Sequence, residues 1–233
     1  MPELDLEQFF AEMGRRDKAD KLERYRRLNA LAKPGQILLA GSSLMEQFPI
    51  YELLQDAGVS LPVYNRGVGG FVIQEFRDAL DVCVLQLRPS HLFLNIGTND
   101  MNGPGYTLEG LLAQYEAVLG EILEALPQVK ITLLAYYPLC EARMREDPHM
   151  AEVLRYRNNR TIAQANQGVE GLARRLGLSF ADCNRFLVDE TGGLRREYTI
   201  EGMHIYGDGY AQVLKALLPL LQRAAAEIRG SAK

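Results

Sequence analysis

Short apolar runs alternate with longer helical patterns along most of this chain. Each run has about the length of a strand, and several are apolar at nearly every position, as in strands buried on both faces of a sheet. Alternation of such runs with helices indicates βαβ units and a parallel sheet. We therefore predict five strands: Ile37-Leu38-Leu39-Ala40, Val63-Tyr64-Asn65, His91-Leu92-Phe93-Leu94-Asn95, Ile131-Thr132-Leu133-Leu134-Ala135 and Leu178-Ser179-Phe180-Ala181.

Apolar residues that recur at spacings of three and four predict the helices between these strands. Residues 74–87 carry one such stripe, and we expect a single helix there. A second helix should begin at Thr107 and run towards Leu126, because Pro127 marks its end.

The second half of the chain contains two further helical patterns. Residues 151–176 predict a long helix or a helix pair, closed by Gly177. Residues 210–228 predict the last helix, in which Pro219 should introduce a kink or begin a second segment.

The chain also opens with a helical pattern, over residues 4–31, in which Gly14 is a possible break. Because this segment precedes the first strand, we expect a helical extension that packs on the core. It could equally form a contact between copies of the chain in a homo-oligomer.

Composition narrows the function classes. Of 233 residues, 47% are hydrophobic and 24% charged, as in ordinary soluble proteins. A net charge of −4 argues against a nucleic-acid binder, whose affinity rests on a clustered basic surface. The three widely spaced cysteines, Cys83, Cys140 and Cys183, indicate neither a disulfide framework nor a zinc site, so we expect buried thiols. No secretory signal or membrane span is evident. We therefore expect a soluble, cytoplasmic protein, provided that no leader precedes this sequence.

Polar and glycine-rich segments follow three of the predicted strands, at the edge where ligands bind in an open parallel sheet. A fourth such segment lies just before the last helix. The segments are Gly41-Ser42-Ser43-Leu44-Met45, Asn65-Arg66-Gly67-Val68-Gly69-Gly70, Gly97-Thr98-Asn99-Asp100 and Glu201-Gly202-Met203-His204.

In their order and placement these four segments resemble the signature blocks of the SGNH hydrolases, in the GDSL lipase/esterase superfamily. The first resembles the GDSL block, with Ser42 where the family usually has Asp. The last resembles the DxxH block, with Glu201 where Asp is expected. The resemblance covers residues 37 to about 221. It implies a site made of the nucleophile Ser43, the base His204, its partner Glu201, the oxyanion glycine Gly70 and the oxyanion asparagine Asn99 of the GxND block.

Histidine is the natural base for acyl transfer to a serine near neutral pH, and the chain has three. His91 begins the third strand, away from the carboxyl ends, and should be structural. His149 follows Asp147-Pro148 in a charged segment and should be solvated or capping. His204 lies in a glycine-rich connection, where a loop residue can lean over the sheet. The residues alone therefore favour His204.

Ser43 has two interpretations. A serine directly after a strand and a glycine could simply be the N-cap of the next helix. Ser42 is the competitor for the nucleophile, but the resemblance favours Ser43 and leaves Ser42 to contribute turn hydrogen bonds.

Met45, Met101 and Met203 each adjoin one of the four segments, and could either shape an acyl pocket or pack in the core.

Glu201 and the oxyanion donors carry alternatives as well. A carboxylate three residues before the base can fold back to orient the imidazole. Because Glu201 is one methylene longer than Asp, it could instead be a surface acid, with a backbone carbonyl holding His204. The tetrahedral intermediate needs donors for its oxyanion, and the Ser43 and Gly70 N–H groups and the Asn99 amide qualify. Gly70 and Asn99 would also suit plain turns.

Cofactor and metal sites are not expected. Gly67-Val68-Gly69-Gly70 resembles part of the dinucleotide-binding fingerprint. That fingerprint requires a glycine at position 72, which is Val72 here, and it should follow the first strand. No GxxxxGK[ST] motif is present. Asp100 has no second carboxylate or histidine at a spacing useful for a metal.

We therefore expect a flavodoxin-like three-layer α/β/α sandwich with a five-stranded parallel sheet, the SGNH hydrolase fold. It should form one domain over residues 1–233, with a helical extension at 1–33 and a core at 36–221. The expected function is a serine esterase that cleaves a small-molecule carboxylic ester through an acyl-enzyme. Acetyl and other short-chain esters, lysophospholipids, acylated sugars and thioesters remain open as substrates. The alternative is a noncatalytic binding or scaffold module on the same fold.

Overall fold

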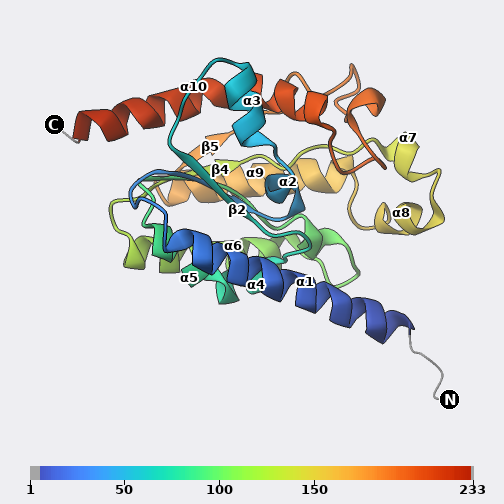
Figure 1. Ribbon diagram of the computed structural model, residues 1–233. Coiled ribbons are helices and arrows are strands. Elements are labelled where there is room, and N and C mark those ends of the chain that lie inside the picture. The colour runs from blue at the N-terminus through green and yellow to red at the C-terminus, as the bar shows by residue number, and fades with distance from the viewer. Residues whose placement is uncertain (1–5, 232–233) are drawn as a thin grey trace.

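The computed structural model describes residues 6–231, and a five-stranded parallel sheet forms its centre (Figure 1). The strands are β1 (Ile37–Gly41), β2 (Val63–Gly67), β3 (His91–Asn95), β4 (Lys130–Leu134) and β5 (Ser179–Ala181), in the order β2-β1-β3-β4-β5. This is the flavodoxin-like order, whose ligand crevice lies where the strand order reverses, between β1 and β3. The prediction of five parallel strands in an α/β/α fold is confirmed.

Alternate side chains of the central strands enter two hydrophobic cores, one on each face of the sheet. Leu38 and Leu92 pack on one face with helices α6 (Leu108–Ala125) and α9 (Asn159–Arg175). Leu39 and Phe93 pack on the other face with α3 (Ile50–Asp56) and α10 (Gly207–Ser231). Figure 1 shows α3 and α10 together on one side of the sheet, and α1 (Leu6–Asn29), α4 (Ile73–Asp78), α5 (Leu80–Cys83) and α6 on the other.

The remaining elements are short helices: α2 (Ser43–Glu46), η1 (Leu85–Leu87), η2 (Asn99–Met101), α7 (Glu141–Met144), α8 (Pro148–Val153) and η3 (Arg196–Tyr198).

The expectation of one helix over residues 74–87 is wrong. The backbone leaves helical geometry at Ala79 (φ −99°, ψ 9°) and again at Val84 (φ −137°, ψ −58°), which separates α4, α5 and η1. The whole apolar stripe is nevertheless buried. The regular spacing therefore predicted correctly which side chains are buried. It did not show that the helical backbone is interrupted twice.

Two other helical predictions are confirmed in their essentials. Helix α6 begins after Thr107, whose hydroxyl accepts a hydrogen bond from the Gly110 N–H at 3.0 Å. Residues 151–176 contain the end of α8 and then α9, so the helix-pair alternative holds. Asn158 caps α9 by accepting from the Thr161 N–H, and Gly177 follows its last turn with φ +68°.

The two terminal helices are more continuous than expected. Helix α1 runs through Gly14 without a break, since an exposed glycine within a helix costs only about 1 kcal/mol. Leu4 and Asp5, which belonged to the predicted segment, lie outside the described residues. Helix α10 contains Pro219 inside a single helix, so no second segment begins there.

Helix α1 packs on the core only through its second half. Leu22 and Tyr25 lie against the core formed with α6 and α9. The first half exposes an apolar stripe formed by Leu6, Phe9, Phe10 and Met13. Among residues 6–231 no helix is both long enough and apolar enough to cross a membrane.

Candidate active site

Strands β1, β2 and β3 end in one row at the carboxyl edge of the sheet. In the pairing register Gly41 lies opposite Gly67 of β2 and Asn95 of β3. Gly41 has φ +151°, and a Cβ at this position would lie 1.9 Å from the Asn95 carbonyl oxygen. The segments that carry Ser43, Gly70 and Asn99 therefore leave the sheet at the same edge. The second strand was expected to end at Asn65, but β2 also includes Arg66 and Gly67.

Ser43 is the first residue of α2, and Ser42 occupies the N-cap position, so the interpretation of Ser43 as an N-cap is wrong. The Nε2 atom of His204 lies 3.0 Å from the Ser43 hydroxyl oxygen. The Oε1 atom of Glu201 lies 2.5 Å from Nδ1 on the other side of the same ring. All three side chains are partly exposed. The structure thus brings a hydroxyl, an imidazole and a carboxylate into one line.

The direction of the hydrogen bonds in this line follows from the chemistry of its end groups. An ionised carboxylate only accepts, so the Nδ1–H of His204 must donate to Glu201. In a neutral imidazole Nε2 then keeps its lone pair, and the Ser43 hydroxyl donates to it. This arrangement can take a proton from Ser43 without any rotation of the ring.

The loop between Thr199 and His204 explains how a glutamate reaches the imidazole. The Thr199 hydroxyl accepts from the Gly202 N–H at 2.9 Å and donates to the His204 carbonyl oxygen at 2.7 Å. The same Oε1 atom of Glu201 that contacts the ring also accepts from the His204 backbone N–H at 3.2 Å. The tight loop therefore folds the longer side chain back onto His204, and the surface-acid alternative is wrong.

Glu201 is held in its charged form. Burial by itself would raise the pKa of Glu201, but its hydrogen bonds to the His204 ring and backbone and the charge attraction to that ring outweigh burial, so the pKa is lowered. A carboxylate that stays ionised near neutral pH can stabilise an imidazolium cation beside it.

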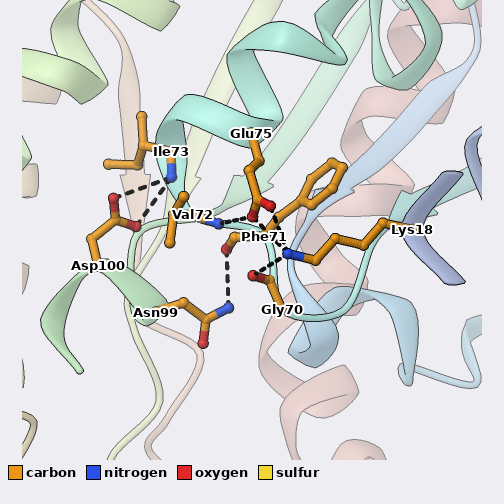
Figure 2. A network of polar contacts seen from close by, with 8 residues as sticks. All are labelled: Lys18, Gly70, Phe71, Val72, Ile73, Glu75, Asn99 and Asp100. Atoms are coloured by element: carbon orange, nitrogen blue, oxygen red, sulfur yellow. Dashed lines mark hydrogen bonds and ion pairs between the residues drawn. The ribbon is translucent and has the colours of Figure 1, made fainter. Parts of the chain in front are cut away.

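The segments with Gly70 and Asn99 lie next to each other (Figure 2). The Nδ2 atom of Asn99 donates one proton to the Phe71 carbonyl oxygen at 2.9 Å, which leaves its second N–H available. Gly70 has φ +75°, and its N–H has no acceptor among the described residues. A Cβ on the neighbouring Gly69 would lie 3.7 Å from the Ser43 Cβ, so this loop passes close to the serine.

The side chains that hold this loop in place were not predicted from the sequence. Glu46, one turn after Ser43, accepts from the Gly69 N–H at 2.5 Å and pairs with Lys21 of α1. Lys18 of α1 contacts both Gly70 and Glu75. The available signal was the spacing of Lys18, Lys21 and Tyr25 on one helix face, but nothing in the sequence shows what that face covers.

Asp100 has a structural role at the start of α4. Its carboxylate accepts from the Ile73 N–H at 3.1 and 3.2 Å and so caps the start of α4. Burial raises the pKa of Asp100 to about 6, against a smaller opposing effect of those backbone hydrogen bonds.

Two expectations about neighbouring residues are decided by burial. The Ser42 hydroxyl is buried and has no hydrogen-bond partner among the described residues, so the expected side-chain turn bonds are absent. Instead its carbonyl oxygen accepts from the Met45 and Glu46 N–H groups. Met45, Met101 and Met203 are buried in the two cores, so they do not line an acyl pocket.

The remaining histidines and the cysteines are remote from this chemistry. His91 pairs with Glu227 at 2.9 Å at the amino end of β3, as a structural residue. His149 lies in the first turn of α8, beside the capping residue Asp147. Cys83, Cys140 and Cys183 are free and buried, as expected.

Arg157 is a further residue whose place near the site was not predicted from the sequence. Its side chain is fully buried, and its Nη1 atom donates to the Met203 sulfur at 3.0 Å. Burial lowers the pKa of Arg157 to about 10, although the charge of Glu201 opposes this. Arg157 therefore places a buried positive charge close enough to the Glu201 carboxylate to interact with it.

Comparison with known proteins agrees with this geometry. The GDSL-like Lipase/Acylhydrolase family profile matches residues 41–212. The human platelet-activating factor acetylhydrolase IB subunit alpha2 is 25% identical over 198 residues, which cover 84% of this chain and 80% of the relative.

Solved structures show the same fold. A Streptococcus pneumoniae protein provisionally named a platelet activating factor superposes with a TM-score of 0.82 at 28% identity, covering 94% of this chain and 99% of its own. A GDSL-like lipase from Bacteroides thetaiotaomicron has a TM-score of 0.70 at 21% identity, covering 87% and 98% of the two chains. An acetylxylan esterase from Geobacillus stearothermophilus has a TM-score of 0.58 at 19% identity, covering 81% and 95%. The chain belongs to the GDSL-like lipase/acylhydrolase family, within the SGNH hydrolase superfamily.

Proposed function

We propose that this protein is a serine esterase that cleaves short-chain carboxylic esters through an acyl-enzyme. The observation that carries the proposal is the line of contacts from Ser43 through His204 to Glu201, at 3.0 and 2.5 Å. Family membership supports a hydrolase, and the line of contacts supplies the groups that the chemistry needs.

In the first half-reaction the Ser43 oxygen attacks the carbonyl carbon of the ester. His204 takes the serine proton at Nε2, and Glu201 stabilises the imidazolium that forms. The oxyanion of the tetrahedral intermediate accepts hydrogen bonds from the Ser43 N–H, the Gly70 N–H and the Asn99 side-chain amide. His204 then donates its proton to the leaving alcohol, and the acyl group remains on Ser43.

In the second half-reaction a water molecule replaces the alcohol. His204 takes a proton from this water as it attacks the acyl carbon, and the same donors hold the second oxyanion. Collapse of the intermediate releases the carboxylic acid and returns the proton to Ser43. The cycle needs no cofactor and no metal.

A short acyl group is the substrate class that we favour. The methionines beside the site are packed in the cores, so these side chains do not line a channel for a long chain. The 25% identical relatives carry acetylhydrolase in their names, which points to the acetyl ester as the first substrate to test.

Hydrolysis of p-nitrophenyl esters from acetyl to palmitoyl tests the proposal. We expect kcat/KM to be highest for the shortest acyl groups, and Ser43→Ala to abolish turnover of every ester. No turnover of any ester by the wild-type protein would favour a noncatalytic binding module on this fold. A maximum at palmitoyl would leave the esterase intact but refute the short-chain preference.

A further inference from the structure

The peptide that carries the Gly70 N–H is tied on both sides. Before it, the Gly69 N–H donates to Glu46 Oε2 at 2.5 Å. After it, the Gly70 carbonyl oxygen accepts from Lys18 Nζ at 3.1 Å (Figure 2). The N–H group of Gly70 lies between these two hydrogen bonds and takes part in neither of them. We call residues 68–72 the glycine loop.

Helix α1 supplies the outer anchors of the glycine loop. Lys18, Lys21 and Tyr25 follow one another at spacings of three and four, so they share one face of the helix. Lys21 pairs with Glu46 at 2.9 Å, and the Tyr25 hydroxyl donates to the Gly67 carbonyl oxygen at 2.6 Å. Three successive side chains of this face therefore contact β2, the glycine loop or the glutamate that holds it.

Lys18 is the most closely fitted of the three. Its Nζ atom also contacts both oxygens of Glu75, at 2.7 and 2.8 Å, and lies 5.6 Å from the centre of the Phe71 ring. Its Cε atom lies 3.3 Å from the point that a Cβ on Gly70 would occupy. The absence of a side chain at Gly70 thus leaves room for Lys18.

The loop needs such anchors because of its composition. Two adjacent glycines have more backbone freedom than any other pair, and Gly70 is exposed at φ +75°. A rotation of the Gly69–Gly70 peptide would change the direction of its N–H group. Donors in an oxyanion hole act through being fixed before the reaction begins.

We propose that Lys18, together with Lys21 acting through Glu46, positions the Gly70 N–H for the oxyanion, so that helix α1 completes the active site from outside residues 41–212, which the family profile matches. The inference rests on the proposed esterase function. Lys18 and Lys21 are positioning residues, since neither needs to touch the ester.

Lys18→Met keeps the length of the side chain and removes its charge and donors. With p-nitrophenyl acetate we expect kcat to fall about tenfold to a hundredfold while KM changes less than about twofold, because the loss falls on the transition state. Lys18→Arg, which keeps the donors, should recover most of kcat. The matched control is Lys130→Met, which breaks the 2.7 Å ion pair with Glu227 at the opposite end of the sheet and should leave kcat unchanged.

A second readout does not depend on turnover. In the NMR spectrum of ¹⁵N-labelled protein, we expect the Gly69 and Gly70 amide signals to shift and broaden in Lys18→Met and to stay unchanged in Lys130→Met. Both variants should melt within a few degrees of the wild type.

The outcomes separate the two proposals. Wild-type turnover that depends on Ser43, combined with unchanged kcat or unchanged glycine amides in Lys18→Met, overturns the positioning role and leaves the esterase standing. Higher KM at constant kcat also overturns it, because that would assign Lys18 to substrate binding. If the wild-type protein turns over no ester, both the proposed esterase function and the role of Lys18 in the oxyanion hole are refuted.

Discussion

His204 lies 3.0 Å from Ser43, although the two residues are 161 positions apart in the chain. The helix that follows His204 explains how this distance is kept. Near the start of α10, the Tyr210 hydroxyl donates to the Leu44 carbonyl oxygen at 2.9 Å, and its ring stacks on Phe48 at 4.8 Å. One buried tyrosine thus connects the histidine segment to the helix that begins at the serine.

Tyr210→Phe should therefore weaken both the fold and the reaction. It keeps the stacked ring but removes a buried hydrogen bond, so we expect a loss of about 1 kcal/mol in the free energy of unfolding. A several-fold fall in kcat should accompany it, because the serine and histidine segments lose a direct connection. Urea unfolding and ester kinetics measure the two effects. The exposed Tyr206 provides a control: Tyr206→Phe should change neither, and equal behaviour of the two variants would refute the connection.

Glu201→Gln should lower kcat by about 10²- to 10⁴-fold at neutral pH. The amide cannot stabilise an imidazolium, and its NH₂ group can donate to Nδ1, which would leave the Nε2 proton facing Ser43. Steady-state kinetics with p-nitrophenyl acetate gives the result, with the exposed Glu197→Gln as the matched control. If Glu201→Gln turns over as fast as the wild type, Ser43 and His204 act as a dyad.

Asn99→Ala should cost about 10²- to 10³-fold in kcat, the usual effect of losing one oxyanion donor. The variant also loses the bond to the Phe71 carbonyl oxygen, so a drop of about 1 kcal/mol in the free energy of unfolding is expected. Its exposed neighbour serves as control, and Asn102→Ala should leave kcat unchanged. Near-wild-type turnover by Asn99→Ala in a folded protein would remove Asn99 from the mechanism.

Asp100 gives a prediction about stability and pH. Because burial raises the pKa of this acid to about 6, from 3.8, the folded protein binds more protons than the unfolded chain between these values. Its contribution to stability is therefore greatest below pH 3.8 and is lost as pH rises through about 6. Asp100→Asn removes the titration and keeps an oxygen for the Ile73 N–H.

Relative to the wild type, Asp100→Asn should gain about 1–2 kcal/mol in the free energy of unfolding between pH 4 and pH 7, a figure reduced because Asp100 is only partly buried. Urea unfolding at both pH values measures this difference. A gap between the two proteins that stays constant with pH would show that Asp100 does not titrate in this range.

The sheet could be predicted from the sequence for physical reasons, whereas Ser43 and Glu201 were assigned from the family resemblance. Strands buried on both faces are recognisable as short apolar runs, and parallel strands place their carboxyl ends at one edge. We therefore expected the segments of Ser43 and Asn99 at the same edge of the sheet. His204 was selected because only its position, among the three histidines, allows it to lean over the same edge.

Backbone breaks and long-range side-chain contacts escaped prediction. The helix breaks at Ala79 and Val84 depend on how the apolar stripe packs, which its spacing does not record. The contact of Lys18 with Gly70, 52 positions away, depends on where α1 docks, and a charged helix face usually meets solvent. The way in which the extra methylene of Glu201 is accommodated could not be predicted, because it depends on the loop anchored by Thr199.

Covalent labelling with a fluorophosphonate, followed by peptide mapping in a mass spectrometer, tests the central claim most directly. The reagent reports a serine activated by its neighbours, and Ser42 next to Ser43 provides an internal competitor. We predict a single adduct on Ser43, unchanged labelling of Ser42→Ala and no labelling of Ser43→Ala. Labelling that persists in Ser43→Ala, or a wild-type protein that resists the reagent altogether, would contradict the account.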